Sequence, residues 1–393
     1  MIRYDFILEK YVFVMTDFHY LDNSATTRTT EDVADVIYNI LVKDFGNPSS
    51  LHNLGFAAEK LMTQAKKDLA KVLDCSADEL YFTSGGTEAN NWAISSGYQL
   101  RHRRAKEVIT TAFEHSSVLD SVKRLEEQGA TCHYVYPDKQ GHILPLDVLD
   151  LVNENTALVS LMMVNNEIGT VLPIKQLCAA IKAKNPDVLI HCDAVQAFCK
   201  LPISLSSLGV DLLTVTGHKI NAPKGIGLLY VKKGVRIKPM VVGGKQQNGM
   251  RPGTENVAYA CGFAHAAKKH SADRIANYNR VAELRDYLLS LVEQNNEIIV
   301  NSPKDALPYI VNISVKGIRS ETMMHFLAQK NIYVSSGSAC AKGELSHVLK
   351  AIALAPDAAD SALRISFGIE NTKEDITALY DAIVQAQQTL SRR

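Results

Sequence analysis

The sequence lacks a net charge and a long hydrophobic run. Its 42 basic residues equal its 42 acidic residues, so no overall field draws the chain to nucleic acid or to an anionic membrane. No stretch reaches the roughly 18 to 20 apolar residues that a membrane-spanning helix needs. The expected substrate is therefore a small metabolite, with no direct nucleic-acid or membrane partner.

The sequence also lacks a paired-cysteine motif, and its first residues do not look like a signal peptide. Its seven cysteines form no C-x-x-C motif and are odd in number, which argues against a disulfide framework or a zinc knuckle and favours a reducing cytoplasm. The first residues carry Asp5 and Glu9 and have no small-residue cleavage site. Because the recognisable pattern begins just after Met15, residues 1–14 are expected to be an N-terminal extension.

The 393 residues exceed the roughly 250 to 300 at which a single hydrophobic core stops growing. We therefore expect a large domain over residues 29–262 and a small C-terminal domain over residues 263–393. The N-terminal segment, residues 1–28, is expected to pack with the small domain.

Helical periodicity alternates with short β-rich runs between about residues 55 and 235, a pattern typical of a parallel α/β sheet. A single long helix is expected over residues 257–294, followed by a smaller α+β unit. Ligands of open α/β sheets bind at the carboxyl ends of the strands. The strands of the large unit are predicted at residues 80–82, 108–110, 133–136, 158–164, 188–191, 212–215 and 227–231.

Three motifs follow predicted strands. Gly86 and Thr87 lie in a Gly-Gly-Thr turn that could cradle a phosphate at a helix N-terminus, although a plain strand-to-helix turn has the same residues. Asp193 ends a buried strand, where a protonated pyridine nitrogen would pair with it and Gln196 would lie near the ring's phenolic oxygen. The alternative role for Asp193 is a helix cap.

The third motif is Thr216-Gly217-His218-Lys219. Desolvation of Lys219 would supply a neutral amine for imine formation, and Thr216 and His218 would suit a phosphate. Alone, Lys219 could be a solvated surface lysine. The three motifs occur in order, each at a strand end of one α/β unit, and together they predict pyridoxal 5′-phosphate bound to Lys219.

Four further residues are candidates for chemistry. His115 could stack on the cofactor ring and move protons, and Asn166 could bind the ring oxygen or the substrate. Alone, each of these two residues would more often be a polar turn residue with its hydrogen bonds satisfied within the protein. Arg364 lies in an apolar β run, where its partner is either a substrate carboxylate or an internal acid. Cys340 lies in a small-residue loop beside Lys342, whose charge favours the thiolate.

From residues 20–27 and the run Gly46-Asn47-Pro48-Ser49-Ser50 to Arg364, the chain resembles the cysteine desulfurases of the class V aminotransferase group. The resemblance implies a fold-type I pyridoxal-phosphate enzyme: a mainly parallel seven-stranded sheet between helices, with a smaller α+β domain. It also implies a homodimer in which Thr254 reaches the phosphate of the neighbouring subunit. Cofactor contacts are implied at Gly86, Thr87, Asp193, Gln196, Thr216, His218, Lys219 and Thr254, and the residue chemistry above adds His115 and Asn166 as expected contacts.

The implied activity converts L-cysteine to L-alanine. Lys219 would move the α-proton, His115 would assist, and Arg364 and Asn166 would bind the substrate. Cys340 would carry the sulfur as a persulfide to an acceptor protein for iron–sulfur cluster assembly or for tRNA or cofactor thiolation. No resident metal is expected, and Cys340 is a candidate transient ligand of a cluster.

Departures from the family pattern include Thr216 in place of serine, Ala222 in place of glycine and a short loop after Cys340. Three alternatives stay open: a selenocysteine lyase, another class V aminotransferase, and an interaction protein that keeps the fold without the cofactor.

Overall fold

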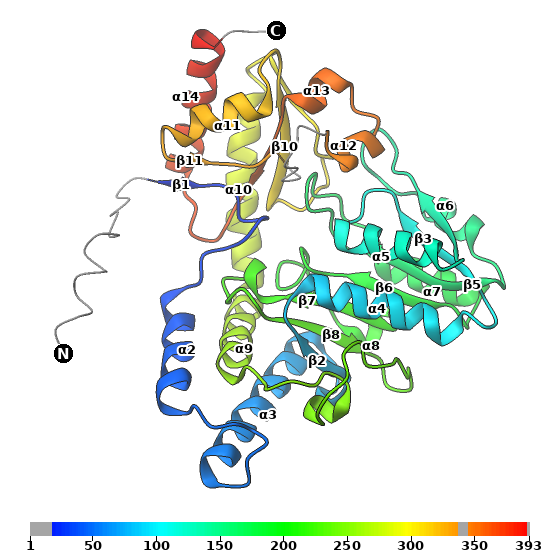
Figure 1. Cartoon of the computed structure of the whole chain (residues 1–393). Helices are drawn as coiled ribbons and strands as arrows, with labels where there is room; N and C mark the ends of the chain where they lie inside the picture. The colour runs from blue at the N-terminus through cyan, green and yellow to red at the C-terminus, as the bar shows by residue number, and fades with distance from the viewer. Residues whose placement is uncertain (1–17, 337–344, 391–393) are drawn as a thin grey trace.

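The computed structural model describes residues 18–336 and 345–390 and contains a central seven-stranded sheet (Figure 1). The spatial order is β2-β8-β7-β6-β5-β3-β4, and only β8 runs antiparallel to its neighbours. The predicted fold class is therefore confirmed. The strands are β2 (Leu80–Thr83), β3 (Glu107–Thr111), β4 (Thr131–Val135), β5 (Thr156–Met162), β6 (Leu189–Asp193), β7 (Leu212–Thr216) and β8 (Gly227–Val231).

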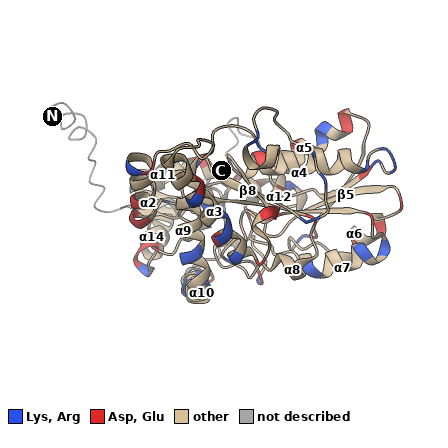
Figure 2. Cartoon of the chain, turned by 90° about the horizontal axis from the view of Figure 1, so that it is seen from below, with Lys and Arg blue, Asp and Glu red and all other residues tan. Residues whose placement is uncertain are grey.

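Helices cover both faces of this sheet, so its central strands carry no exposed face. Every residue of β5, β6, β7 and β8 is buried, as expected of strands covered on both sides. Figure 2 shows α4 (Gly86–Arg101) and α5 (Ser116–Glu127) on one side of the sheet. The opposite side carries α6 (Pro145–Leu151), α7 (Ile174–Lys184) and α8 (Leu205–Leu208).

Three helices pack together beside the β2 end of the sheet: α2 (Glu31–Lys43), α3 (Asn53–Leu73) and α9 (Val257–Ala272). A side chain at Gly262 of α9 would meet Ile37 Cγ1 of α2 at 2.7 Å, so glycine permits the close approach. The prediction of a single helix over residues 257–294 was wrong. Asp273, with φ −92° and ψ 6°, separates α9 from α10 (Arg274–Val292), and aspartate is one of the residues that favour helix ends over interiors.

The C-terminal part contains a second, antiparallel sheet with the order β12-β10-β9. Residues 19–22 join this part, because β1 (His19–Tyr20) pairs with β11 (Ile332–Tyr333) and Asp22 bridges to Ser366. The expected domain limits stay a prediction. The remaining elements are β9 (Ile298–Val300), β10 (Ile310–Val315), α11 (Ser320–Ala328), α12 (His347–Ala351), α13 (Pro356–Asp360), β12 (Ala362–Ser366) and α14 (Lys373–Thr389).

Within residues 18–336 and 345–390, no helix has both the length and the apolar character needed to cross a membrane.

Candidate active site

The three predicted motifs lie at the carboxyl ends of β2, β6 and β7. His115 and Asn166 follow β3 and β5, which belong to the same sheet and run parallel to β6 and β7. The ends of parallel neighbouring strands meet at one edge of a sheet. This arrangement brings the candidate residues of the large unit to a common edge.

The Gly-Gly-Thr turn opens helix α4. Its N-cap, Gly85, contributes no side-chain cap, and the first N–H groups of a helix have no partner within the helix. A side chain at Gly227 would come within 2.7 Å of the Gly85 backbone, so the turn packs directly on β8. The exposed Thr87 hydroxyl and the free helix N-terminus form a suitable site for an anion.

Asp193 is held by a buried polar network. Asn90 Nδ2 of α4 donates to Asp193 Oδ2 at 2.7 Å and to Ser117 Oγ at 2.9 Å. The Val195 N–H donates to Asp193 Oδ1 at 2.9 Å. Ser117 Oγ in turn lies 2.9 Å from His115 Nδ1. Asn90 and Ser117 therefore position the two predicted residues relative to each other, and sequence reasoning did not identify either of them.

His115 caps helix α5 with its ring. Its Nδ1 accepts the Ser117 N–H at 3.1 Å. Burial lowers the pKa of the imidazole, and the Asp193 carboxylate only partly opposes this shift. A neutral ring that accepts at Nδ1 carries its proton on Nε2.

Lys219 ends the short 3-10 turn η2 (Gly217–Lys219) that follows β7. Its Nζ donates to the carbonyl oxygens of Ser24 and Ala25 at 2.5 and 2.6 Å. Burial, with the charges of Arg364 and Lys200, lowers the pKa of the amine to about 7. A large fraction of Lys219 is thus neutral near pH 7 and able to react with a carbonyl group.

Gln196 and the unpredicted Lys200 lie beside this lysine. Gln196 Nε2 donates to the Ser24 carbonyl oxygen at 3.0 Å, and Lys200 Nζ donates to Gln196 Oε1 at 3.2 Å. Lys200 is only 8% exposed. Its position four residues after Gln196 was the signal that could have identified it.

His218 and Thr216 make contacts with the protein itself. His218 Nδ1 lies 3.2 Å from Thr26 Oγ1, and burial together with the Lys219 charge lowers the pKa of the imidazole to about 3. Thr216 Oγ1 donates to the Ile226 carbonyl oxygen at 3.1 Å. The phosphate contacts expected of both residues stay predictions.

Arg364 forms the internal ion pair that the sequence left open. Its Nη2 donates to Asp22 Oδ1 at 2.8 Å, and its Nη1 donates to the Asn166 carbonyl oxygen at 3.1 Å. Arg364 Nε and Asn166 Oδ1 are buried without a hydrogen-bond partner in the described part of the chain. These two atoms are a donor and an acceptor whose hydrogen-bonding capacity the described residues do not use.

Thr254 lies near the start of the Gly-Gly-Thr turn of its own chain. It lines a cavity of about 200 Å³ that Ser84, Ile226 and Arg251 also border, and Arg251 Nε donates to Glu88 Oε1 of α4 at 2.9 Å. The expected reach of Thr254 to a neighbouring subunit stays a prediction.

Cys340 lies outside the described residues. Across the described residues, no group of three histidine, cysteine or acidic side chains is arranged to hold a metal ion.

Comparison with known proteins identifies the family. Residues 19–379 match the family described as aminotransferase class-V. The chain belongs to this family. It is also 37% identical over 379 residues to a protein named cysteine desulfurase IscS from Dictyoglomus turgidum, a match that covers 95% of this chain and 96% of that protein.

Further similarities place this class-V aminotransferase family member among the NifS/IscS-like proteins, which confirms the predicted resemblance. A cysteine desulfurase IscS from Methanosarcina thermophila is 36% identical, with 94% of this chain and 92% of that protein covered. A solved NifS-like protein superposes with a TM-score of 0.91 at 34% identity, covering 95% of this chain and 100% of that chain. A structure described as SspA in complex with cysteine has a TM-score of 0.80 at 30% identity, covering 90% of this chain and 100% of that chain.

Proposed function

We propose that the protein is a pyridoxal-phosphate-dependent cysteine desulfurase that converts L-cysteine to L-alanine and retains the sulfur as a persulfide on Cys340. The observation that carries the proposal is the Lys219 amine, whose pKa is lowered to about 7 at the same strand-end edge as Asp193. The cysteine desulfurase names of the relatives and the cysteine named in the SspA structure support the choice of substrate.

The site fits the cofactor. The uncapped N-terminus of α4 at Gly86 and Thr87 suits its phosphate, and Asp193 suits its ring nitrogen. The unpartnered Asn166 Oδ1 and Arg364 Nε suit further polar groups of cofactor or substrate. When bound, pyridoxal phosphate supplies an electron sink for the substrate's α-carbon.

The chain's own residues then provide binding and proton movement. Lys219, neutral in large part near pH 7, accepts the α-proton from the substrate. His115 Nε2 holds a second transferable proton, because its Nδ1 is occupied by the Ser117 N–H. Arg364 binds the substrate carboxylate while Asp22 and the Asn166 carbonyl oxygen fix the plane of its guanidinium group.

Cys340 is the proposed sulfur carrier. Burial raises the pKa of every described cysteine, so those thiols are protonated at neutral pH: Cys75, Cys132, Cys178, Cys192, Cys199 and Cys261. Ser335, shortly before Cys340, pairs its backbone with that of Arg364, so the chain leads into the Cys340 segment from the proposed substrate site.

The sulfur transfer balances without an added oxidant. A bond forms between Cys340 Sγ and the substrate sulfur while the substrate's Cβ–S bond breaks. The carbon skeleton gains a proton and leaves as alanine. Cys340 then holds the sulfane sulfur, which an acceptor protein removes for iron–sulfur cluster assembly or for tRNA or cofactor thiolation. We place this activity in the cytoplasm, in keeping with the six free cysteines of the described residues.

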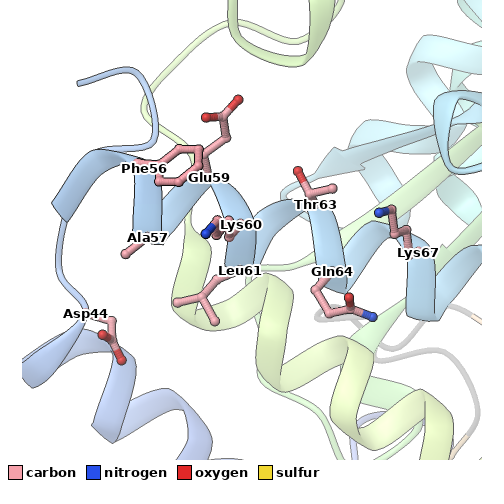
Figure 3. A pocket seen from close by; sticks show the side chains of 9 residues that line it. All are labelled: Asp44, Phe56, Ala57, Glu59, Lys60, Leu61, Thr63, Gln64 and Lys67. Atoms are coloured by element: carbon pink, nitrogen blue, oxygen red, sulfur yellow. The ribbon is translucent and has the colours of Figure 1, made fainter. Parts of the chain in front are cut away.

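We also propose a homodimer, because exposed apolar side chains are concentrated around α2 and the start of α3. Leu51 is fully exposed, and Phe45 is 68% exposed. A cavity of about 710 Å³ runs along α3, where Phe56 and Leu61 lie beside Lys60 (Figure 3). Exposed apolar surface of this kind marks a protein–protein contact. The other large exposed apolar side chains of this region are Tyr38, Leu41, Val42 and Leu54.

The test measures alanine and sulfide formed from L-cysteine, in the presence of pyridoxal phosphate and a thiol but without a 2-oxo acid. The parent and a Cys261→Ser control should release alanine at the same rate, whereas Cys340→Ser should keep the cofactor's visible absorbance and release almost none. Release by Cys340→Ser at the parent rate would contradict the persulfide role. Alanine that appears only with an added 2-oxo acid would indicate an aminotransferase, and a strong preference for selenocysteine would indicate a selenocysteine lyase.

A further inference from the structure

Lys200 is a buried cation that the proposed reaction does not use. It is 8% exposed, and it forms no ion pair with a carboxylate in the described part of the chain. Burying a charge without an opposite charge is unfavourable. A buried lysine without a carboxylate partner, directly beside the site, is therefore expected to have a function that offsets its cost to stability.

The contacts of Lys200 all connect it to the site or to the core around it. Its Nζ donates to Gln196 Oε1 at 3.2 Å and lies 5.3 Å from the centre of the Tyr309 ring. Cys199, immediately before it, has φ of 59°, a left-handed conformation that turns the chain at the end of the segment after β6. Titratable and charged groups from several elements act on Lys200 or are affected by it: Cys199, His218, Lys219, His270, Tyr309 and Arg364.

Gln196 links Lys200 to Lys219. Gln196 Nε2 donates to the Ser24 carbonyl oxygen at 3.0 Å, and Lys219 Nζ donates to the same oxygen at 2.5 Å. A glutamine amide can present either its oxygen or its nitrogen, but an ammonium group can only donate. Lys200 therefore requires Oε1 on its own side, which leaves Nε2 directed toward the Ser24 carbonyl oxygen that Lys219 Nζ also contacts.

We propose that Lys200 is a positioning residue that fixes the side-chain amide of Gln196 with its donor toward the reactive site. The proposal rests on the proposed function in one respect, because the donor would serve the cofactor's ring oxygen. Without Lys200, only the Ser24 carbonyl oxygen still holds the amide, and rotation of the amide can present Oε1 to Lys219. That oxygen would accept from the protonated Lys219 nitrogen and stabilise its charged form.

The first experiment titrates Lys219 in the full chain freed of small molecules. Trace acetylation with acetic anhydride between pH 5.5 and 9.5, read by mass spectrometry of the Lys219 peptide, gives the midpoint of its ionisation. The parent midpoint is expected at about 7. Lys200→Met should raise it by about one unit, and Lys200→Arg should leave it near the parent value.

Lys268→Met is the matched control. Lys268 lies on α9 outside the site, and its Nζ lies 3.2 Å from Asp68 Oδ2 of α3. This variant should leave the Lys219 midpoint unchanged. An unchanged midpoint in Lys200→Met, accompanied only by a loss of thermal stability, would show a purely structural lysine and overturn the proposal.

A double-mutant cycle separates positioning from the effect of charge alone. If Lys200 acts through Gln196, then adding Lys200→Met to Gln196→Ala should move the midpoint by less than half the shift seen in the parent background. The part of the shift that persists is the direct effect of the Lys200 charge on Lys219. Full persistence would leave no part of the shift to Gln196 and would overturn the positioning role.

The second experiment follows the visible absorbance of the chain loaded with pyridoxal phosphate as a function of pH. Lys200→Met should move the spectral midpoint upward, with the same dependence on Gln196. Absence of visible absorbance in the parent would refute the proposed function, whereas the acetylation experiment would still decide the role of Lys200.

Discussion

Replacing Asn90 by leucine tests the network that holds Asp193. The substitution keeps the approximate size of the side chain but removes both donors of the amide nitrogen, the one to Asp193 Oδ2 at 2.7 Å and the one to Ser117 Oγ at 2.9 Å. Asp193, which is 5% exposed, would keep only the Val195 N–H as a donor among the described residues. Both the stability of the fold and the binding of the cofactor should suffer.

The magnitude follows from these contacts. A hydrogen bond to a buried carboxylate contributes about 1.5–3 kcal/mol, and the bond to Ser117 contributes about 1 kcal/mol. Leucine also removes Asn90 Oδ1, which is buried without a partner among the described residues. Removal of this unsatisfied acceptor stabilises the fold and offsets about 1 kcal/mol of the loss. The net loss of unfolding free energy should be about 1.5–3 kcal/mol.

Urea unfolding followed by fluorescence measures this loss, because the chain's one tryptophan, Trp92, is buried on the same helix. The control is Asn91→Leu, since the half-buried Asn91 donates, within the described part of the chain, only to the Thr87 carbonyl oxygen one turn earlier. Asn90→Leu should also weaken pyridoxal-phosphate binding relative to this control. Equal stabilities and equal cofactor affinities in the two variants would refute the role assigned to Asn90.

Three further outcomes are expected. Lys219→Ala should abolish the visible absorbance of the bound cofactor, and the exposed Lys224→Ala should retain it; retention by both would assign the cofactor to another residue. Burial raises the pKa of Glu114 from its ordinary 4.5 to about 8. Between pH 4.5 and about 8, Glu114 is protonated in the folded state but ionised in the unfolded state. The free energy of unfolding should therefore fall as pH rises through this interval, by up to about 1.4 kcal/mol per pH unit. In urea titrations at several pH values, Glu114→Gln should remove this dependence of the unfolding free energy on pH. An unaltered dependence would contradict the role assigned to Glu114. Arg364→Lys should raise KM for L-cysteine about tenfold or more, because the planar fork is lost, whereas an unchanged KM would exclude Arg364 from substrate binding.

Much of the site could be predicted because its signals are local. A strand followed by Gly86 and Thr87, or by the Thr216 to Lys219 motif, is recognisable within a few residues. The rule that ligands gather at the carboxyl ends of parallel strands then joins such motifs without knowledge of their contacts. These residues lie where the sequence placed them, at the ends of β2 and β7.

The remainder depends on contacts between distant segments. Asn90 meets Asp193 across 103 positions and Arg364 meets Asp22 across 342, so neither pairing leaves a local pattern. Lys200 was missed for a different reason: a lysine is assumed to be solvated, and only packing against Tyr309 and Gln196 shows that it is buried. The break between α9 and α10 was missed because helical periodicity continues on both sides of Asp273.

The central claim is that sulfur from L-cysteine passes to Cys340 through a site organised around Lys219. The most direct measurement is the mass of the Cys340 peptide after the full chain, loaded with pyridoxal phosphate, is exposed to L-cysteine without a reductant. The peptide should gain the mass of one sulfur atom in the parent and should remain unchanged in Lys219→Ala. An unmodified Cys340 in a parent protein that still releases alanine, or the added sulfur on a different cysteine, would contradict the account.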